Sequence, residues 1–581
     1  KMTSEAGPLF AGLDRFECRK RVVADMEAAN LLEKIEDHTH QVGHCSRTGD
    51  VIEPRVSIQW FVKMQPLAEP AIAAVKSGDI TFHPARWSKV YLDWMENIRD
   101  WCISRQLWWG HRIPVWYCED CQEVIVQRED PTQCPSCSST RLQQDPDVLD
   151  TWFSSWLWPF ATLGWPKKTA ELDYFYPTNV LVSGYDIIFF WIARMIMAGY
   201  EFLGEKPFSQ VYITSMIKDA QGRIMSKSLK NGIDPIDMIE QYGADAVRYS
   251  LVALATEGQD IKLSQGKFEM GRNFGNKVWN TYRFILANRQ PTAGNGAADT
   301  PAPQLMDRWI LSRLAATQDL VAASFDRYKL NDALNAVYDF LWHDYCDWYL
   351  ELLKDRVGPQ GSDPDIVNRV ATPVLEEVMI LLHPFMPFIT EEIWQGLGGG
   401  ARDSIMRAAP GSRIAATLDP DADGQMRILR QITLVVRNIR GEMSIPPQRA
   451  VPTIIATTNT ESGKVLQEFA GYLKRMAKVA SLEVRESYQP SEATATGIIS
   501  DMEVYVPLAG LIDLGVERQR LEKERQRLEQ FLRSLAGKLQ NEKFVANAPA
   551  DVVQKERDKF AECESNHQKI LRTLATLSET S

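Results

Sequence analysis

The sequence predicts an α/β fold in its first half, an all-α domain behind it and an antiparallel coiled coil at its end. Strand-like apolar runs alternate with helical patterns between about residues 86 and 265, as in an open parallel sheet. From about residue 266 to 445, apolar residues recur at three- and four-residue steps, which is typical of packed helices. Near the end, leucines recur with the seven-residue period of a coiled coil, at Leu514, Leu521, Leu528 and Leu535.

The composition is that of a globular chain with several domains. The 581 residues are 45% hydrophobic and 24% charged, and the net charge is −11. This charge excludes a basic coat over the whole molecule, so any nucleic acid must meet local basic patches. No apolar run approaches the length of about eighteen residues that a transmembrane helix needs, and no signal peptide is visible. Five of the nine cysteines are scattered singly, which favours a reducing cytoplasm.

Strand–loop–helix units organise the α/β region. Val180-Leu181-Val182 reads as a strand, and Ser183 to Asp186 then leads into a helix expected over Ile187 to Met197. A second strand is expected over Val211 to Ile213. Shifts of pattern divide the chain near residues 85, 265, 445 and 510.

A lysine between two serines stands out in the loop after the second strand. Met225-Ser226-Lys227-Ser228 precedes a helix expected to open near Asp234-Pro235. The ammonium supplies a point charge and the two hydroxyls supply neutral donors, a combination suited to phosphate. Such a short string also occurs by chance in loops, so the surrounding residues decide its meaning.

Gly184 and Asp186 follow a strand at its carboxyl end, which is the usual binding edge of a parallel sheet. The glycine allows close approach of a ligand, and the carboxylate could accept hydrogen bonds from ribose hydroxyls. A turn glycine and a helix-capping aspartate explain the same residues equally well. Trp152 and Trp191 could wall a small apolar pocket, although core packing would account for each of them alone.

Two cysteine pairs have the spacing of a zinc knuckle. Cys118 and Cys121 form one pair, Cys134 and Cys137 form the other, and twelve residues lie between the pairs. Four thiolates can close a tetrahedron around Zn²⁺ without an open position, so we expect a structural rather than a catalytic metal.

Longer strings carry a resemblance to a known family. The chain resembles class I aminoacyl-tRNA synthetases of the valine/isoleucine/leucine subgroup in the strings Asn97 to Trp116, Asp147 to Ser155, Asp186 to Met197, Asn273 to Asn280 and His383 to Phe388. The terminal hairpin, with Asn541 to Phe544 and Ala548-Pro549, is similar to that of the valyl branch. The isoleucyl branch usually ends in a cysteine-rich zinc module, which does not occur in this sequence.

The resemblance implies a fold for each segment. It implies the second half of a class I Rossmann-type catalytic domain, an all-α anticodon-binding bundle and a C-terminal antiparallel coiled coil. In order, the segments correspond to the distal part of an editing domain (1–85), the Rossmann half with the zinc knuckle at 118–137 (86–210), a signature-loop and stem-contact region (211–265), the anticodon-binding domain (266–445), a small α/β junction (446–510) and a tRNA-binding arm (511–581).

The resemblance also implies a reaction. The family activates its amino acid with ATP and Mg²⁺ and then transfers the aminoacyl group to tRNA, here valine and tRNA(Val). Lys227 matches the catalytic lysine, and the ATP-binding positions are Gly184, Asp186, Met225, Ser226, Lys227 and Ser228. Trp152 and Trp191 match the walls of the amino-acid pocket. The complete enzymes also edit mischarged threonine, which a pocket for valine cannot strongly reject. In one departure from the family pattern, Ile224 replaces the first lysine of the signature.

Other interpretations remain open at this point. The family's His-containing first ATP signature occurs nowhere in the sequence, so we expect a fragment without the N-terminal part that is inactive alone. The alternatives are an isoleucyl enzyme, a noncatalytic tRNA-binding fragment or a zinc-ribbon scaffold. Between Glu517 and Lys543, eight Lys/Arg and five Glu give a local charge of +3, which fits tRNA contact, although a solvated helix face would look similar. We expect a cytoplasmic monomer without a membrane partner.

Overall fold

The computed structural model describes residues 1–45, 48–52, 57–226, 229–256, 259–290, 302–357, 361–363, 365–400, 402–490, 493–499, 501–512, 514–541 and 550–578. The chain divides into two compact units. The first comprises Lys1–Gln65 and Arg99–Ser154, and the second comprises Pro66–Ile98 and Ser155–Ser581. Among the described residues, no helix combines the length and the apolar character needed to cross a bilayer.

Short antiparallel strand pairs build the first unit. The pairing of Phe61 with Cys102 joins the segment before Gln65 to the segment after Arg99. The zinc-knuckle segment therefore groups with the N-terminal residues, whereas the sequence pattern placed it with the α/β region. The strands are β1 (Phe61–Val62) paired with β3 (Trp101–Cys102), β4 (Ser104–Arg105) paired with β8 (Val148–Leu149), and β5 (Val115–Cys118) between β6 (Val124–Val126) and β7 (Leu142–Gln144).

The N-terminal helix α1 spans Arg15–Ala28, after a single 3₁₀ turn at Ser4–Ala6. Asp14 caps it, because its carboxylate accepts a hydrogen bond from the Phe16 N–H at 2.9 Å. The helix ends soon after Ala28, where Asn30 adopts a left-handed φ of 52°.

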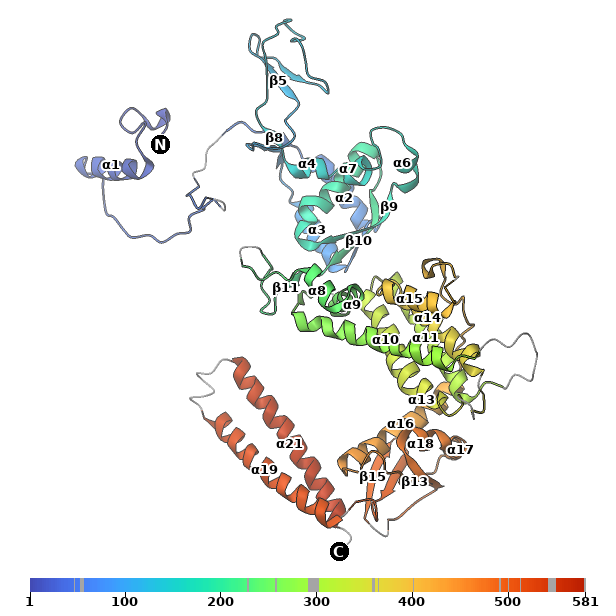
Figure 1. Cartoon of the computed structure of the whole chain (residues 1–581). Coiled ribbons are helices and arrows are strands. Elements are labelled where there is room, and N and C mark those ends of the chain that lie inside the picture. Colours follow the sequence, from blue (N-terminus) through green and yellow to red (C-terminus); the bar gives the residue numbers. More distant parts are fainter. Residues whose placement is uncertain are drawn as a thin grey trace. The chain divides into compact units, whose positions relative to one another are not determined.

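A three-stranded parallel sheet forms the core of the α/β region (Figure 1). The strands β2 (Thr81–His83), β10 (Phe208–Thr214) and β9 (Thr178–Gly184) lie in that order, and both pairings are parallel. The two strands predicted from the apolar runs fall inside β9 and β10. Strand β10 is the central strand, and its side chains Val211 and Ile213 are buried. The helices of this region are α2 (Gln65–Lys76), α3 (Arg86–Glu96), α4 (Thr151–Ser155), α5 (Trp158–Ala161), α6 (Ala170–Phe175) and α7 (Ala193–Leu203).

The segment after β9 is not the uniform helix that the sequence predicts. A 3₁₀ turn at Tyr185–Ile187 leads into a π-helical turn at Ile188–Ile192, and α7 follows. Short π-helical turns widen a helix locally and are frequent near functional sites.

A small layer follows the sheet. Strand β11 (Ile217–Lys218) pairs in parallel with β12 (Ile261–Lys262), and helices α8 (Pro235–Tyr242) and α9 (Ala244–Leu254) lie between them in the chain. Helix α8 opens at the predicted place, because Asp234 accepts the Ile236 N–H at 2.8 Å and Pro235 occupies the first helical position. The hydrophobic core of this small layer consists of Met238, Val247, Ile261, Leu263 and Phe268.

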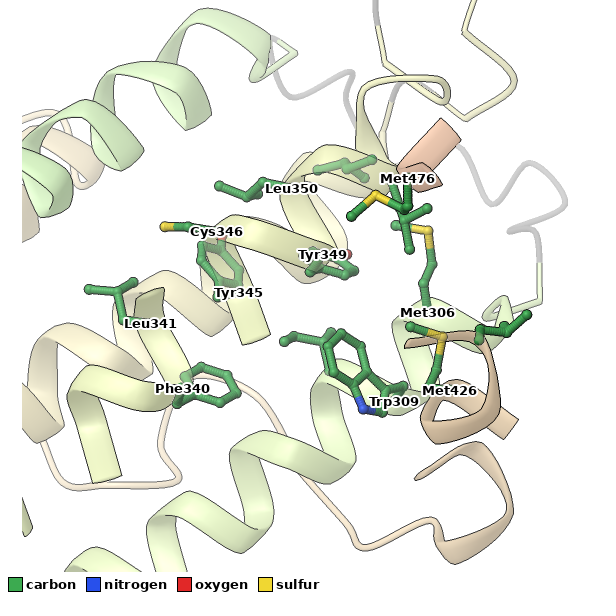
Figure 2. Close-up of a cluster of buried hydrophobic side chains, with 14 of the residues drawn as sticks. Met306, Trp309, Phe340, Leu341, Tyr345, Cys346, Tyr349, Leu350, Met426 and Met476 are labelled. Atoms are coloured by element: carbon green, nitrogen blue, oxygen red, sulfur yellow. The ribbon is translucent and has the colours of Figure 1, made fainter. Parts of the chain in front are cut away.

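A helical bundle follows, and aromatic and sulfur-containing side chains fill its core. Figure 2 shows Met306 and Trp309 of α11 gathered with Tyr349, Met426 and Met476. All five side chains are buried. The bundle contains α10 (Glu269–Asn288), α11 (Leu305–Asp326), α12 (Leu330–Asp339), a π-helical segment (Phe340–Tyr349), α13 (Leu350–Leu353), a second π-helical segment (Val367–Ala371), α14 (Thr372–Leu382), α15 (Pro387–Leu397) and α16 (Pro420–Glu442).

Removal of the buried Arg356 side chain should destabilise this bundle. Its guanidinium is 5% exposed and pairs with Asp307 at 2.8 Å and with Asp363 at 2.9 Å, and both carboxylates are buried. Arg356→Met leaves these charges without their partner, so we expect the free energy of unfolding to fall by about 3–5 kcal/mol. Urea denaturation, followed by hydrogen exchange in α11, measures the loss.

Arg407→Met is the matched control for that experiment. Arg407 pairs with Asp403 at 3.4 Å, but both side chains are largely exposed. The control should change stability by no more than about 0.5 kcal/mol. Equal effects of the two substitutions would contradict a stabilising role for the buried network.

A four-stranded sheet and a long helical hairpin complete the second unit. The sheet has the order β14-β13-β16-β15, in which β13 and β14 are parallel and the other pairings are antiparallel. Helices α19 and α21 then pack along each other (Figure 1). Buried Leu521 and Leu535 lie at the predicted seven-residue positions. The elements are β13 (Val451–Thr457), α17 (Thr460–Glu468), α18 (Ala470–Ala477), β14 (Val479–Arg485), β15 (Thr494–Ile499), β16 (Met502–Pro507), α19 (Leu514–Gln540) and α21 (Ala550–Ser578).

Candidate active site and metal centre

The carboxyl ends of β9 and β10 form the edge at which Gly184 and Asp186 were predicted to bind a nucleotide. Gly184 is the last residue of β9 and pairs with Thr214, the last residue of β10. A Cβ atom on Gly184 would lie 2.7 Å from Asp186 Oδ1, so only glycine leaves this carboxylate in its place. Asp186 itself is exposed. At this edge of the sheet the Asp186 carboxylate is therefore exposed to solvent, next to Gly184, which has no side chain.

Tyr185, between these two residues, is held on two sides. Its ring stacks on Trp87 of α3 with 5.1 Å between centroids and 10° between planes. Its hydroxyl donates to Asp260 at 3.4 Å. Sequence reasoning missed this support, because Trp87 and Asp260 lie far from Tyr185 in the chain.

Asp260 is also the partner of Lys218 at the start of the next layer. The Lys218 ammonium lies 2.6 Å from Asp260 Oδ2, and the Met216 N–H donates to Asp260 Oδ1 at 3.3 Å. The hydrogen bond from Lys218 lowers the pKa of Asp260, and the same bond raises the pKa of Lys218. This ion pair joins β11 to the residue before β12.

The loop of the predicted signature runs between β11 and α8. Met225 packs against the core of the small layer, whereas Ile224 is 61% exposed. The Ser226 N–H donates to Asn231 Oδ1 at 2.9 Å. Lys227 and Ser228 lie outside the described residues, so their roles in the signature stay predictions.

Asp219 organises the base of this loop, a role that its polarity alone did not predict. Its carboxylate is 6% exposed and accepts the backbone N–H groups of Gln221 at 3.0 Å and Arg223 at 2.8 Å. It also accepts the Asn231 amide at 2.9 Å and the Arg223 guanidinium at 2.8 Å. The hydrogen bond from Asn231, followed by those from Arg223, lowers the pKa of Asp219 to about 2.

The two predicted pocket tryptophans belong to different units. Trp191 lies in the π-helical turn after β9, is partly exposed, and donates its indole N–H to the Ser155 carbonyl at 2.9 Å. Trp152 lies in α4 and is also partly exposed. Asp150 caps the backbone there, because it accepts the Trp152 N–H at 3.1 Å. Their joint role in an amino-acid pocket stays a prediction.

Asp150 also forms an ion pair with Arg105. The guanidinium lies 2.5 Å from Asp150 Oδ2, which also accepts the Trp101 indole N–H at 3.0 Å. Arg105 thus has a structural partner. The neighbouring Trp108 and Trp109 are almost fully exposed, so core packing does not account for them within the first unit.

The four predicted zinc ligands come together at the ends of the β5–β6–β7 sheet. The Sγ atoms of Cys118, Cys121, Cys134 and Cys137 all lie within 4.8 Å of one another. A tetrahedron of thiolates about 2.3 Å from Zn²⁺ has sulfur–sulfur distances of about 3.8 Å. Cys118 to Cys137 measures 3.5 Å and Cys121 to Cys134 measures 3.6 Å, so the residues fit the ion.

Comparison with known families agrees with this geometry. The family model described as tRNA synthetases class I (I, L, M and V) matches residues 17–264, and the anticodon-binding domain of tRNA ligase matches residues 307–455. The catalytic and anticodon-binding family models of the class I aminoacyl-tRNA synthetases thus match this chain in the expected order. A third family model, the valyl tRNA synthetase tRNA binding arm, matches residues 513–578.

The most similar relatives include bacterial valine–tRNA ligases. The enzyme of Carboxydothermus hydrogenoformans is 48% identical over 96% of this chain and 63% of its own length. That of Syntrophotalea carbinolica is 46% identical over 96% of this chain and 62% of its own length, and that of Geobacter sulfurreducens is 46% identical over 99% and 65%. The chain thus spans somewhat less than two thirds of the length of these relatives.

Proposed function

We propose that this chain carries the ATP-signature, anticodon-binding and arm portions of a valine–tRNA ligase. The whole enzyme joins valine to ATP, releases pyrophosphate and passes the valyl group from valyl-adenylate to tRNA(Val). The main support is the similarity of 46–48% to valine–tRNA ligases over nearly the whole chain. The match of residues 513–578 to a valyl arm favours valine over the isoleucyl alternative.

The residues at the strand ends are suited to adenylation. Asp186 would accept hydrogen bonds from the ribose hydroxyls of ATP, and Gly184, which has no side chain, would let the nucleotide approach the strand closely. Lys227 would stabilise the charge that develops on the leaving pyrophosphate, with Ser226 and Ser228 as neutral donors. Mg²⁺ would neutralise phosphate charge when it is bound with ATP. Ile224 occupies the position of the first signature lysine, so this position carries no cation here.

The amino-acid pocket would be apolar on two sides. Trp152 and Trp191 supply the flat surfaces, and each is held at its backbone or indole N–H by a protein partner. Such a pocket rejects larger isoleucine by size but discriminates poorly against threonine, which is nearly isosteric with valine. The complete enzyme would therefore need editing. The zinc centre would hold the knuckle together and take no part in the chemistry.

The tRNA would lie along the bundle and the terminal hairpin. Exposed basic side chains line α19 although the whole chain is acidic; among them are Arg518, Lys523, Arg527 and Arg533. Phosphate contacts of this kind provide affinity without reading sequence. The complete enzyme would act as a monomer, which sedimentation analysis would test.

Reconstitution tests the ligase proposal directly. The completed enzyme consists of this chain fused to the part of the Carboxydothermus hydrogenoformans relative that the chain does not match. It should catalyse valine-dependent ATP–pyrophosphate exchange, whereas the chain alone and the added part alone should not. Isoleucine-dependent exchange would favour the isoleucyl alternative. Binding of tRNA without any exchange would favour a noncatalytic tRNA-binding fragment, the alternative that the absence of the His-containing signature from this sequence supports.

Salt dependence tests the arm. Replacement of Arg518, Arg527 and Arg533 by glutamine should weaken binding of tRNA(Val) to the chain about tenfold or more. It should also lower the slope of log Kd against log salt by about one for each lost phosphate contact. Filter binding between low and moderate salt measures both. The control is Glu524→Gln on the same helix, which removes a negative charge and should not reduce the slope. An unchanged slope in the triple variant would contradict phosphate contact by the arm.

A further inference from the structure

The Asn231 side chain forms hydrogen bonds with three residues of the signature loop. Its side-chain N–H₂ donates to Asp219 Oδ2 at 2.9 Å and to the Ile224 carbonyl at 3.2 Å. Its side-chain oxygen accepts the Ser226 N–H at 2.9 Å. One amide group thus joins the start of the loop, the residue before Met225 and the residue that directly precedes Lys227.

The partner of this amide is itself fixed. Asp219 is buried and accepts two backbone N–H groups from the turn at Gln221 to Arg223, so its carboxylate cannot rotate without breaking them. Gly222 adopts a φ of 82° in that turn, a conformation that favours glycine. Lys218 and Ile224 form an antiparallel bridge at the mouth of the loop. The base of the loop is therefore held by several hydrogen bonds, and Asn231 links it to the Ser226 backbone.

We infer that Asp219 and Asn231 form a positioning pair for the signature loop. They contact no reacting atom; they hold the backbone on the N-terminal side of Lys227 in the geometry that adenylation needs. The inference rests on the proposed function, because it assigns a task to the loop of the same site. Electrostatic stabilisation of a transition state requires a charge that is already in place, so a freely moving loop would lose part of the effect of its lysine.

The chemistry of the pair explains why these two residue types occur together. Asp219 has a pKa of about 2 and stays ionised at every pH used for aminoacylation. It therefore needs a donor at position 231. The Ile224 carbonyl needs a second donor and the Ser226 N–H needs an acceptor at the same position. An amide offers two donor hydrogens and an acceptor, whereas a hydroxyl has only one hydrogen to donate. An aspartate at 231 would keep the acceptor but place a second carboxylate against Asp219.

A double-variant cycle in the completed enzyme tests the pair. Asp219→Asn and Asn231→Asp should each lower kcat of valine-dependent pyrophosphate exchange by about ten- to a hundredfold. The KM for ATP should change by no more than about threefold, because the lost interaction acts in the transition state. In the double variant Asp219→Asn/Asn231→Asp one amide–carboxylate hydrogen bond returns, but position 231 can no longer donate to the Ile224 carbonyl and the amide at position 219 faces the Arg223 guanidinium. We therefore expect only a partial rescue, with a kcat a few times higher than the product of the two single effects. A double variant as slow as the product of the single effects would overturn the inference.

Hydrogen exchange of the chain alone supplies a readout that does not depend on activity. The Ser226 amide should exchange faster in Asn231→Ala than in the unaltered chain, whereas Asn335→Ala should leave it unchanged. Asn335 is an exposed asparagine in α12 that bonds only to Asn331 among the described contacts, so it matches the chemical change. Unchanged exchange at Ser226 in Asn231→Ala would overturn the positioning role.

The outcomes separate this inference from the proposed function. If Lys227→Ala abolishes exchange but Asn231→Asp leaves kcat intact, the ligase proposal stands and the positioning pair is wrong. If Lys227→Ala has no effect, the catalytic assignment fails, and the exchange of the Ser226 amide still decides whether Asn231 orders the loop.

Discussion

Replacement of Lys227 by alanine in the completed enzyme is expected to lower the rate of valyl-adenylate formation by about a hundred- to a thousandfold. The ammonium is proposed to meet the charge that moves onto the leaving pyrophosphate, and loss of one such fixed interaction typically has an effect of about this size. Because the interaction strengthens in the transition state, kcat should fall much more than affinity for ATP. Pyrophosphate exchange at saturating valine measures the change, and thermal unfolding should be almost unaltered.

Lys230→Ala is the matched control. Lys230 is an exposed lysine three residues further along the same loop, with a left-handed φ of 49°. Its removal changes the charge of the loop equally but should affect exchange much less. Equal losses in the two variants would mean that the general charge of the loop matters rather than a particular ammonium. Near-normal exchange in Lys227→Ala would remove the main catalytic assignment.

Loss of zinc is expected to unfold the knuckle in the first unit. We expect about one zinc per chain, and Cys118→Ser should abolish it, because a closed site needs all four thiolates. Cys118 and Cys134 are buried in a very small core with Trp116 and Ile125, which cannot hold the knuckle without the metal. The apparent binding free energy of structural zinc is of the order of 10 kcal/mol in isolated peptides. Metal analysis and limited proteolysis between residues 118 and 144 measure the two effects.

Cys102→Ser is the control for the metal experiment. Cys102 lies in the same unit, in β3, but outside the cluster of four sulfur atoms. It should leave zinc content and proteolysis unchanged. A metal-free preparation that resists proteolysis like the zinc-containing chain would contradict a structural metal.

Local patterns were sufficient for two strands, for the terminal helical hairpin and for the cluster of four cysteines. The apolar runs at Val180 to Val182 and Val211 to Ile213 predicted β9 and β10, since buried parallel strands need continuous apolar residues. The spacing of the cysteine pairs predicted the cluster, because each pair forms one tight turn. The seven-residue leucine period predicted the helical hairpin. In each case the information lies within a few residues of the chain.

The supports of the candidate site were not predictable in this way. Asp260 lies beside Lys218 and Tyr185, and Trp87 stacks on Tyr185, although none of these residues is close to the others in sequence. The π-helical turns at Ile188–Ile192 and Phe340–Tyr349 also interrupt regular helix, and a three- and four-residue apolar period does not distinguish them from an α-helix.

The sequence by itself determined the resemblance to the synthetase family, the two long parallel strands and the grouping of the four cysteines. Only the tertiary structure decided that residues 99–154 pair with the N-terminal segment and that Asp219 and Asn231 close the loop. The physical reason is the range of the interactions: hydrophobic period and turn chemistry act between neighbours, whereas a buried carboxylate finds its donors only after the chain has folded around it.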